Sequence, residues 1–205
     1  SRSPTQSRTH GTAAAAALRG GFGTVLSMAV LVDQAMWEWR GARWAHLVSD
    51  TSYDELHAFA QQIGKRRLGF QGDHYDIDNI DRERALDLGA EPVDARELLA
   101  RLRGAGLRRR NDKPTWERIA AAEQGRSLTI AQVARVPAAL CAAIVELDTL
   151  DKSSRSAVFV DASHAVVLFD WHGDPVEAAR LAVDQVWAGE PRVDGERSLE
   201  LFVER

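Results

Sequence analysis

The sequence predicts an α/β fold, in which a small, mostly parallel sheet with covering helices is followed by an α+β C-terminal appendage. In the first half, short runs rich in Val, Leu and Ile alternate with helical patterns. A charged break at residues 108–112, followed by Pro114, indicates a boundary. Beyond it, an apolar helix precedes strands that alternate apolar and polar residues. We therefore divide the chain into residues 1–27, 28–112 and 113–205.

The composition is that of an ordinary globular protein, with 45% apolar and 27% charged residues. The formal net charge of -4 argues against bulk binding to nucleic acid or to an anionic membrane, although a local basic patch is compatible with it. Apolar runs are shorter than the roughly 18 residues that a membrane-spanning helix needs. Because Cys141 is the single cysteine, an intrachain disulfide is excluded. We expect a cytoplasmic protein with no membrane partner.

Residues 1–27 contain Arg2, Arg8 and Arg19 but no acid, a composition that organellar transit peptides share. We favour a second interpretation, in which the natural chain starts at Met28 and the preceding residues are an upstream extension or a disordered leader. Both interpretations leave this segment outside the fold.

Two strands open the folded part of the chain. The apolar run MAVLVD at residues 28–33 predicts a buried strand, and WAHLVS at residues 44–49 predicts a second one. We expect residues 34–43 between them to form a loop that carries Trp37 and Trp39.

Capping residues and apolar spacing predict three helices in the first half. Ser52 and Glu55 match a capping box, and Gly64 ends that helix. Asp78, after the extended piece HYDI, and Asp94 are placed to cap the next two helices. The residues expected on the inward faces are Leu56, Phe59, Ala60, Ile63, Ala85, Leu88, Leu98, Leu99 and Leu102.

In the second half we expect helices over residues 116–124, 129–135 and 137–150. Residues 157–160 and 165–169 predict two strands joined by a turn.

The C-terminal part predicts one more helix and one more strand. Asp174 and Pro175 form a favoured helix start. The buried stripe of that helix would be Val176, Ala179, Val183 and Val186. In the final strand Leu199, Leu201 and Val203 alternate with Glu200 and Glu204, which predicts one solvated face.

Several short motifs follow one another in a recognisable order. HLVSD is followed by DELHAFAQQIG, FQGDHYDI and RALDLGAEPV. From Met28 to about Arg110, the chain resembles the bacterial and phage family named domain of unknown function 4031. The resemblance supports a chain start at Met28 and implies no established reaction. Residues 113–205 resemble no family that we can name.

The best candidate site combines His46, Asp50, His74 and Asp76. Alternate residues of a strand share a face, so His46 lies with Asp50, and His74 lies with Asp76. Neighbouring parallel strands would bring these residues to one rim of the sheet, with Asp33 at the end of the first strand. Imidazole and carboxylate groups suit a divalent metal (Zn, Mn or Fe) whose open position would activate water. Without a metal, Asp50, His74 and Asp76 would supply acid/base catalysis.

Structural roles compete with this hypothesis. Asp50 would also suit the approach to the helix at Ser52. His57 lies beside the buried helix face and is more simply a hydrogen-bonded core residue. His74 and Asp76 would also suit an ordinary turn.

Arg66, Arg67 and Arg82 are the candidates for phosphate binding. The runs at residues 65–67 and 108–110 follow helix ends, where cations offset the helix dipole, so a solvated role competes. No Walker-type or dinucleotide glycine pattern occurs around the candidate site.

Two functions remain open from the sequence. One is a small metal-assisted hydrolase that acts on a phosphate-bearing or nucleotide-like substrate through the His/Asp rim. The other is a non-catalytic binding or accessory module that recognises phosphate, nucleic acid or an acidic protein partner through its arginines. DNA is not favoured, because the helix expected at residues 129–135 offers only Arg135. The apolar helix and small sheet of the second half suit packing or homodimerisation.

Overall fold

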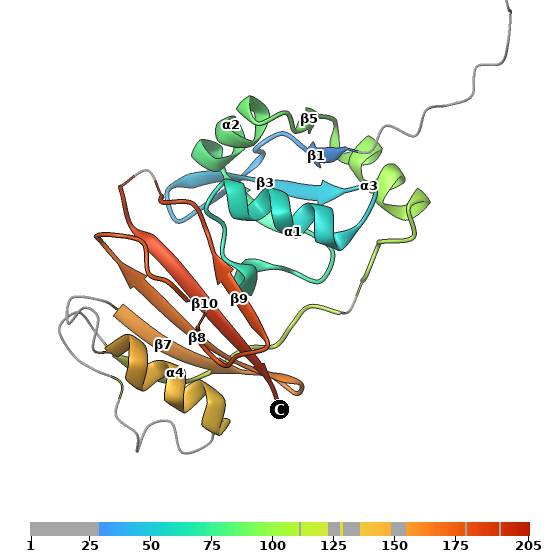
Figure 1. Cartoon of the computed structure of the whole chain (residues 1–205). Coiled ribbons are helices and arrows are strands. Elements are labelled where there is room, and N and C mark those ends of the chain that lie inside the picture. Colours follow the sequence, from blue (N-terminus) through green and yellow to red (C-terminus); the bar gives the residue numbers. More distant parts are fainter. Residues whose placement is uncertain are drawn as a thin grey trace, which may run out of the picture.

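The computed structural model describes residues 29–110, 112–122, 128, 136–148, 155–178, 180–192 and 194–205. The described strands form two five-stranded sheets that lie beside each other (Figure 1). The expected leader and the helix expected at residues 129–135 lie outside the described residues. Below, residues 29–110 are the N-terminal unit and residues 112–205 are the C-terminal unit.

The first sheet is mixed, so the expected mostly parallel sheet was wrong. Its strands are β1 (Val30–Val32), β2 (Trp37–Trp39), β3 (Ala42–Ser49), β4 (Tyr75–Asp78) and β5 (Glu91–Pro92). β3 pairs antiparallel with β1, β2 and β4, whereas β1 and β5 pair in parallel. A parallel crossover needs a dozen or more residues, and the connection between β1 and β3 is too short for one.

The segment expected as a loop forms strand β2 instead. Arg40 and Gly41 have φ angles of 52° and 78°, the positive values that a two-residue type I′ turn requires. This turn joins β2 to β3 and sets Trp37 opposite Trp44. The segment is therefore the first arm of a β-hairpin.

The predicted helices of the N-terminal unit form where their capping residues lie. They are α1 (Tyr53–Gln62), α2 (Asn79–Asp87) and α3 (Ala95–Gly104), with a short 3-10 helix, η1 (Arg67–Gly69), after α1. The side chains of Ser52, Asp78 and Asp94 each accept hydrogen bonds from first-turn amides. The capping box is half formed, because the carboxylate of Glu55 accepts from the hydroxyl of Ser49.

Helices cover both faces of the first sheet. Val32 and Leu47 belong to the core that also contains Leu56 of α1. Leu31 and Val48, their neighbours in sequence, pack with α3 on the opposite side. Successive side chains of a strand point to opposite faces, so both faces of these strands are buried.

The second sheet is antiparallel throughout. It has the order β6-β7-β8-β10-β9. Its strands are β6 (Glu117–Ala122), β7 (Arg155–Val160), β8 (His164–Trp171), β9 (Gln185–Ala188) and β10 (Arg197–Glu204). Helix α4 (Ala138–Asp148) covers the face that points away from the N-terminal unit (Figure 1). The strands expected at residues 157–160 and 165–169 and the long apolar helix are confirmed.

Two expected helices of the C-terminal unit are absent from the described residues. Residues 117–122 form β6 because Ala120 and Ala122 alternate inward while the backbone pairs with β7. The helix expected from Asp174 does not form. Val176 and Val183 pack against the core from an irregular segment that leads into β9.

The expectation that Glu200 faces solvent was also wrong. Its side chain is fully buried, and its carboxylate oxygens accept hydrogen bonds from the amides of Arg67 and Leu68 at 2.5 and 3.1 Å. The face of the second sheet that α4 leaves uncovered therefore packs on η1 of the N-terminal unit.

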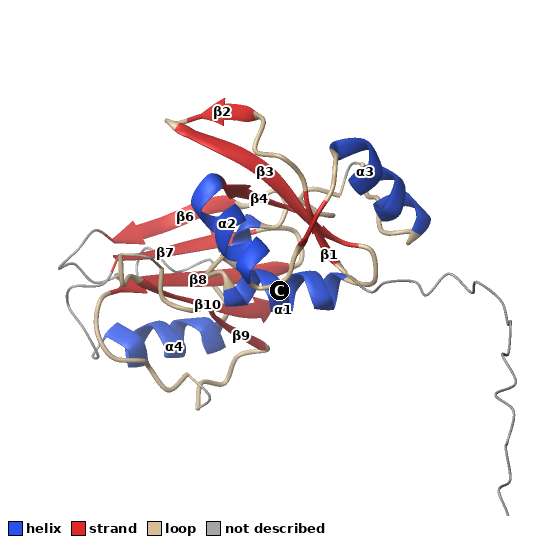
Figure 2. Ribbon diagram, turned by 90° about the horizontal axis from the view of Figure 1, so that it is seen from above, coloured by secondary structure: helices blue, strands red, loops and turns tan. Residues whose placement is uncertain are grey.

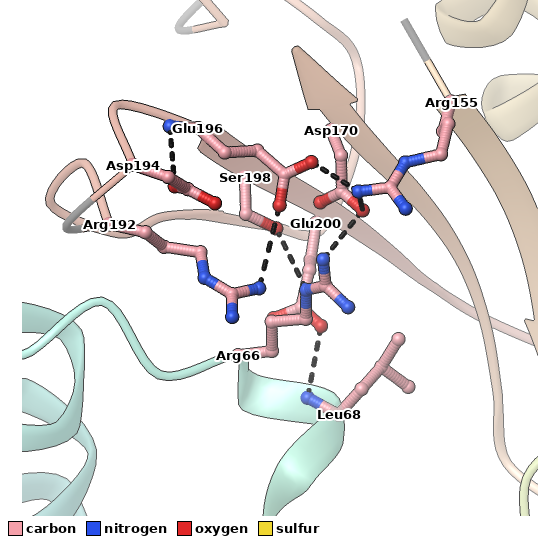
Figure 3. Close-up of polar contacts among 9 residues, drawn as sticks. All are labelled: Arg66, Leu68, Arg155, Asp170, Arg192, Asp194, Glu196, Ser198 and Glu200. Atoms are coloured by element: carbon pink, nitrogen blue, oxygen red, sulfur yellow. Dashed lines mark hydrogen bonds and ion pairs between the residues drawn. The ribbon is translucent and has the colours of Figure 1, made fainter. Parts of the chain in front are cut away.

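Polar and apolar contacts extend this interface on both sides of Glu200. The guanidinium of Arg66 donates to Asp170 at 2.5 Å and to Ser198 at 3.2 Å (Figure 3). The indole of Trp187 donates to the carbonyl of Lys65 at 3.1 Å. An apolar cluster accompanies these contacts and consists of Leu68, Trp116, Val166, Trp187 and Phe202.

We predict that Glu200 makes the stability of the protein depend on pH. Burial raises the pKa of Glu200 to about 7, although the amides of Leu68 and Arg67 act in the opposite direction. Because the folded-state pKa of Glu200 lies above the unfolded value of 4.5, protonation of Glu200 stabilises the fold. This contribution is fully present below about pH 4.5 and is lost as pH rises through about 7. Between about pH 5 and 8, the wild type should lose on the order of 2 kcal/mol more unfolding free energy than Glu200→Gln. Urea denaturation at several pH values measures this difference, and equal losses would contradict it.

Candidate metal centre

The pairing of β3 with β4 places His46 directly opposite Asp76. Side chains of directly opposed residues lie on the same face of an antiparallel pair. His74 immediately precedes β4 and lies on that face too, with its ring centroid 5.2 Å from that of His46. One ligand atom from each of His46, His74 and Asp76 lies within 4.8 Å of the others. This cluster, the His46/His74/Asp76 cluster, contains three of the four residues predicted from the sequence.

A tight turn delivers His74 to this position. The amide of Gln71 donates to the carbonyl of His74 at 2.8 Å, and Phe70 bridges to Tyr75. Gly72 has a φ of +95°, and a Cβ there would lie 2.7 Å from the carbonyl oxygen of Asp112. The FQGDHYD motif is therefore a turn that requires glycine, and its last residues enter β4.

Each histidine of the cluster is oriented by a buried aspartate. Nδ1 of His46 lies 2.7 Å from Oδ2 of Asp33, and Nδ1 of His74 lies 2.6 Å from Oδ1 of Asp73. Asp33 and Asp73 are 4% and 1% exposed. A carboxylate only accepts, so both rings keep the Nδ1 proton, and Nε2 is the ring atom left for a metal. Carboxylate–histidine pairs of this kind fix metal-binding imidazoles.

Asp73 is itself held by the segment after α3. Arg108 and the amide of Arg109 donate to its second oxygen at 2.6 and 2.8 Å. Burial alone would raise the pKa of Asp73, but the hydrogen bonds from His74, Arg109 and Arg108 outweigh it and lower the pKa. Asp73 therefore remains a carboxylate. Sequence analysis missed this residue, although its place directly before His74 was the available signal.

Asp76 and His74 influence each other in the metal-free site. Nε2 of His74 lies 3.4 Å from Oδ1 of Asp76. Burial lowers the pKa of His74, but the hydrogen bonds to Asp76 and Asp73 outweigh that effect and raise it. Burial alone would raise the pKa of Asp76, but the hydrogen bond and the charge of His74 outweigh that effect and lower it. His74 and Asp76 thus each favour the charged form of the other.

Asp50 lies outside the cluster. Its carboxylate accepts from the amide of Ala29 at 3.0 Å and from Nε of Arg101 at 2.8 Å. The prediction that it shares a rim with His74 assumed parallel strands. Because β4 runs antiparallel to β3, Asp76 lies opposite His46. The carboxyl end of β4, Asp78, lies opposite Trp44 and away from Asp50. Asp50 instead ties the end of β3 to α3.

The arginines predicted to bind phosphate make contacts within the protein. Arg66 is paired with Asp170 at the interface between the two units, and the guanidinium of Arg67 lies 5.1 Å from the centre of the Phe70 ring. Arg82 donates to the backbone carbonyl of Asp33 at 2.7 Å. Arg82 therefore supports the strand end that orients His46.

His57 has a packing role, as its position beside the buried face of α1 predicts. It lies in the core, with Nδ1 2.9 Å from the hydroxyl of Tyr75. Burial, followed by the charge of Arg67, lowers the pKa of His57 to about 4. His57 is therefore neutral at physiological pH and stays apart from the cluster.

A surface hollow of about 1060 Å³ includes Asp76 in its wall. Both units contribute to this hollow, which we call the inter-unit hollow. The N-terminal unit supplies Trp37 and Arg84, and the C-terminal unit supplies Lys113 and Trp116. The Trp37 ring lies 4.5 Å from the ring of His46, so the cluster borders the hollow.

Comparison with known proteins supports the family resemblance. Residues 30–105 match the family model described as "Protein of unknown function (DUF4031)". The match covers every strand of the first sheet and α1 to α3. Neither a curated protein nor a solved structure matches the chain. Among the described residues, none of the helices has the length and apolar character needed to cross a bilayer.

We predict that the neutral rings of His46 and His74 carry their proton on Nδ1 in the metal-free protein. Their Nδ1 atoms face the carboxylates of Asp33 and Asp73, which accept hydrogen bonds but donate none. Long-range ¹⁵N–¹H correlation spectra, recorded at a pH where the ¹⁵N shifts themselves show neutral rings, identify the tautomer. The exposed ring of His172 provides an unconstrained reference in the same spectrum. A proton on Nε2 of either clustered ring would contradict the assignment.

Proposed function

We propose that the chain binds one divalent metal ion (Zn, Mn or Fe) through Nε2 of His46, Nε2 of His74 and the carboxylate of Asp76. The supporting observation is that two buried aspartates hold the Nδ1 atoms of both imidazoles, while one ligand atom from each of His46, His74 and Asp76 lies within 4.8 Å of the others. Two histidines and one carboxylate form a donor set that leaves coordination positions open. We further propose that the site performs metal-assisted hydrolysis of a phosphate-bearing or nucleotide-like substrate.

The metal would supply an activated water, because a bound divalent cation lowers the pKa of its water. The residues of the chain would hold and tune this centre. Asp33 and Asp73 hold the protons on the Nδ1 atoms of the rings and thereby make Nε2 a stronger metal ligand. Arg108 and the amide of Arg109 keep Asp73 ionised. Asp76, in the wall of the inter-unit hollow, places the centre within reach of a substrate.

Cations around the hollow support a phosphate-bearing substrate. Lys113 and Arg84 line it, and neither makes an ion pair within the part of the chain that the structure describes. Phosphate esters bind where fixed cations and a metal share their charge. These two residues, rather than Arg66, Arg67 and Arg82, are the better candidates to meet the substrate.

The alternative of a non-catalytic module that binds through arginine clusters has less support. Such a module needs guanidinium groups that are free to meet a partner. Arg66 is paired with Asp170, Arg108 is paired with Asp73, and Arg82 donates to Asp33. Most of these cations therefore stabilise the fold or orient the cluster.

The purified protein should contain up to one divalent metal ion per chain, and His74→Ala should lose it. Elemental analysis and titration with Zn²⁺ or Mn²⁺ measure the stoichiometry and the affinity. His164→Ala is the matched control, because His164 is paired with Asp161 on an exposed hairpin of the C-terminal unit. Equal metal binding by wild type and a folded His74→Ala variant would exclude the proposed ligands.

Asp73→Asn should weaken metal binding by about 10- to 100-fold, because the amide no longer fixes the charge and tautomer of His74. Hydrolysis of bis(p-nitrophenyl) phosphate with added Zn²⁺ or Mn²⁺ should fall in parallel. Asp161→Asn, which alters a similar Asp–His pair on the turn between β7 and β8, should change neither quantity. Metal binding without hydrolysis of any phosphate ester would retain the metal site and reject the reaction.

A further inference from the structure

The β2–β3 hairpin carries three tryptophans beside the candidate metal centre. Trp37 and Trp44 are directly opposed, and Trp39 is 52% exposed near the hairpin tip. The indole of Trp44 donates to the carbonyl of Trp39 at 2.9 Å, which ties the two strands together. The hairpin projects from the body of the protein (Figure 2). Trp37 and Trp44 are half-buried, and the exposed ring of Trp39 lies 4.4 Å from the guanidinium of Arg40.

All three tryptophans line the inter-unit hollow. The hollow thus places aromatic rings, the carboxylate of Asp76 and the cations Lys113 and Arg84 around one space. Some of the other charges of its wall are paired within the protein, whereas Asp78 and Asp194 accept hydrogen bonds from backbone amides. Lys65 is paired with Asp81 at 3.1 Å, and the carboxylate of Asp78 accepts the amides at the start of α2.

Outside the ion pairs the wall carries the charges of Lys113, Arg84, Asp76, Asp78 and Asp194, and a divalent ion bound at Asp76 makes their sum positive. The other wall cations, Arg66 and Arg192, are paired with Asp170 and Glu196. Glu38 is paired with Arg43 at 3.5 Å. A ligand that complements the hollow needs an anionic group for the cations and a flat ring for the indoles.

We propose that the substrate carries an unpaired nucleobase that stacks on the β2–β3 tryptophans while its phosphate lies toward Lys113, Arg84 and the metal. This inference rests on the proposed function, because it names the substrate class of the same centre. Every base has a π face, so an indole platform binds bases with little sequence preference. A free nucleotide and the end of a single strand share this chemistry, and both would reach a site bordered by an open hollow.

Calorimetric titration of the metal-loaded protein tests the role of the base. Adenosine monophosphate should bind at least about tenfold more tightly than ribose 5-phosphate, which has the phosphate without the base. Trp39→Ala should lower the affinity for adenosine monophosphate by about 5- to 100-fold and leave the affinity for ribose 5-phosphate unchanged. Trp39→Phe should keep most of the affinity for adenosine monophosphate. Lys113→Ala should lower the affinities for both ligands by the same factor.

Matched controls separate stacking from general damage. Val145→Ala removes an exposed apolar side chain on α4, and Arg103→Ala removes an exposed cation on α3. Neither should change the affinity for adenosine monophosphate. All variants should bind Zn²⁺ or Mn²⁺ as the wild type does, because none of them is a metal ligand.

The outcomes distinguish the two proposals. Equal affinity for adenosine monophosphate and ribose 5-phosphate, or full affinity in Trp39→Ala, would overturn the base platform and leave the metal centre intact. Base-dependent binding in a protein that takes up no metal would support the platform and reject the proposed function. Tighter binding of a single-stranded oligonucleotide than of the mononucleotide would assign the source to nucleic acid, and the reverse order would assign it to free nucleotides.

Discussion

The antiparallel register of β3 and β4 is the constraint on which the candidate site depends. One face of this pair carries Ala45, Leu47, Tyr75 and Ile77, all of them fully buried. The opposite face carries His46 opposite Asp76. A slip of one residue would exchange the two faces and expose the apolar set, which is energetically costly. The hydrophobic core therefore fixes the relative position of the two groups, and the turn at Gly72 adds His74.

The interface between the two units determines what surrounds the cluster. Glu200 and Asp170 of the second sheet hold η1 through its first amides and through Arg66. The same arrangement brings Lys113 and Trp116 to the hollow that Asp76 borders. Residues 108 and 109 contribute as well, since they hold Asp73 behind His74. The segment that joins the units is thus part of the support of the site.

Local signals in the sequence were sufficient for the three helices of the N-terminal unit and for part of the cluster, whereas the helix start predicted at Asp174 was wrong. Ser52, Asp78 and Asp94 mark helix starts because capping depends on a few neighbouring atoms. His74 and Asp76 share a face because an extended chain alternates, whatever strand lies beside it. Strand direction is not local, so the parallel sheet and the place given to Asp50 were wrong. The burial of Glu200 could not be predicted either, because it depends on packing against a segment more than a hundred residues earlier.

The most direct test of the account is the position of a bound ion. Crystals grown with Mn²⁺ or Zn²⁺, measured at the absorption edge of the metal, give that position from anomalous scattering. The account predicts one strong peak about 2.0–2.3 Å from Nε2 of His46, Nε2 of His74 and a carboxylate oxygen of Asp76. A peak bonded to other residues, or no peak beside these three at saturating metal, would contradict it.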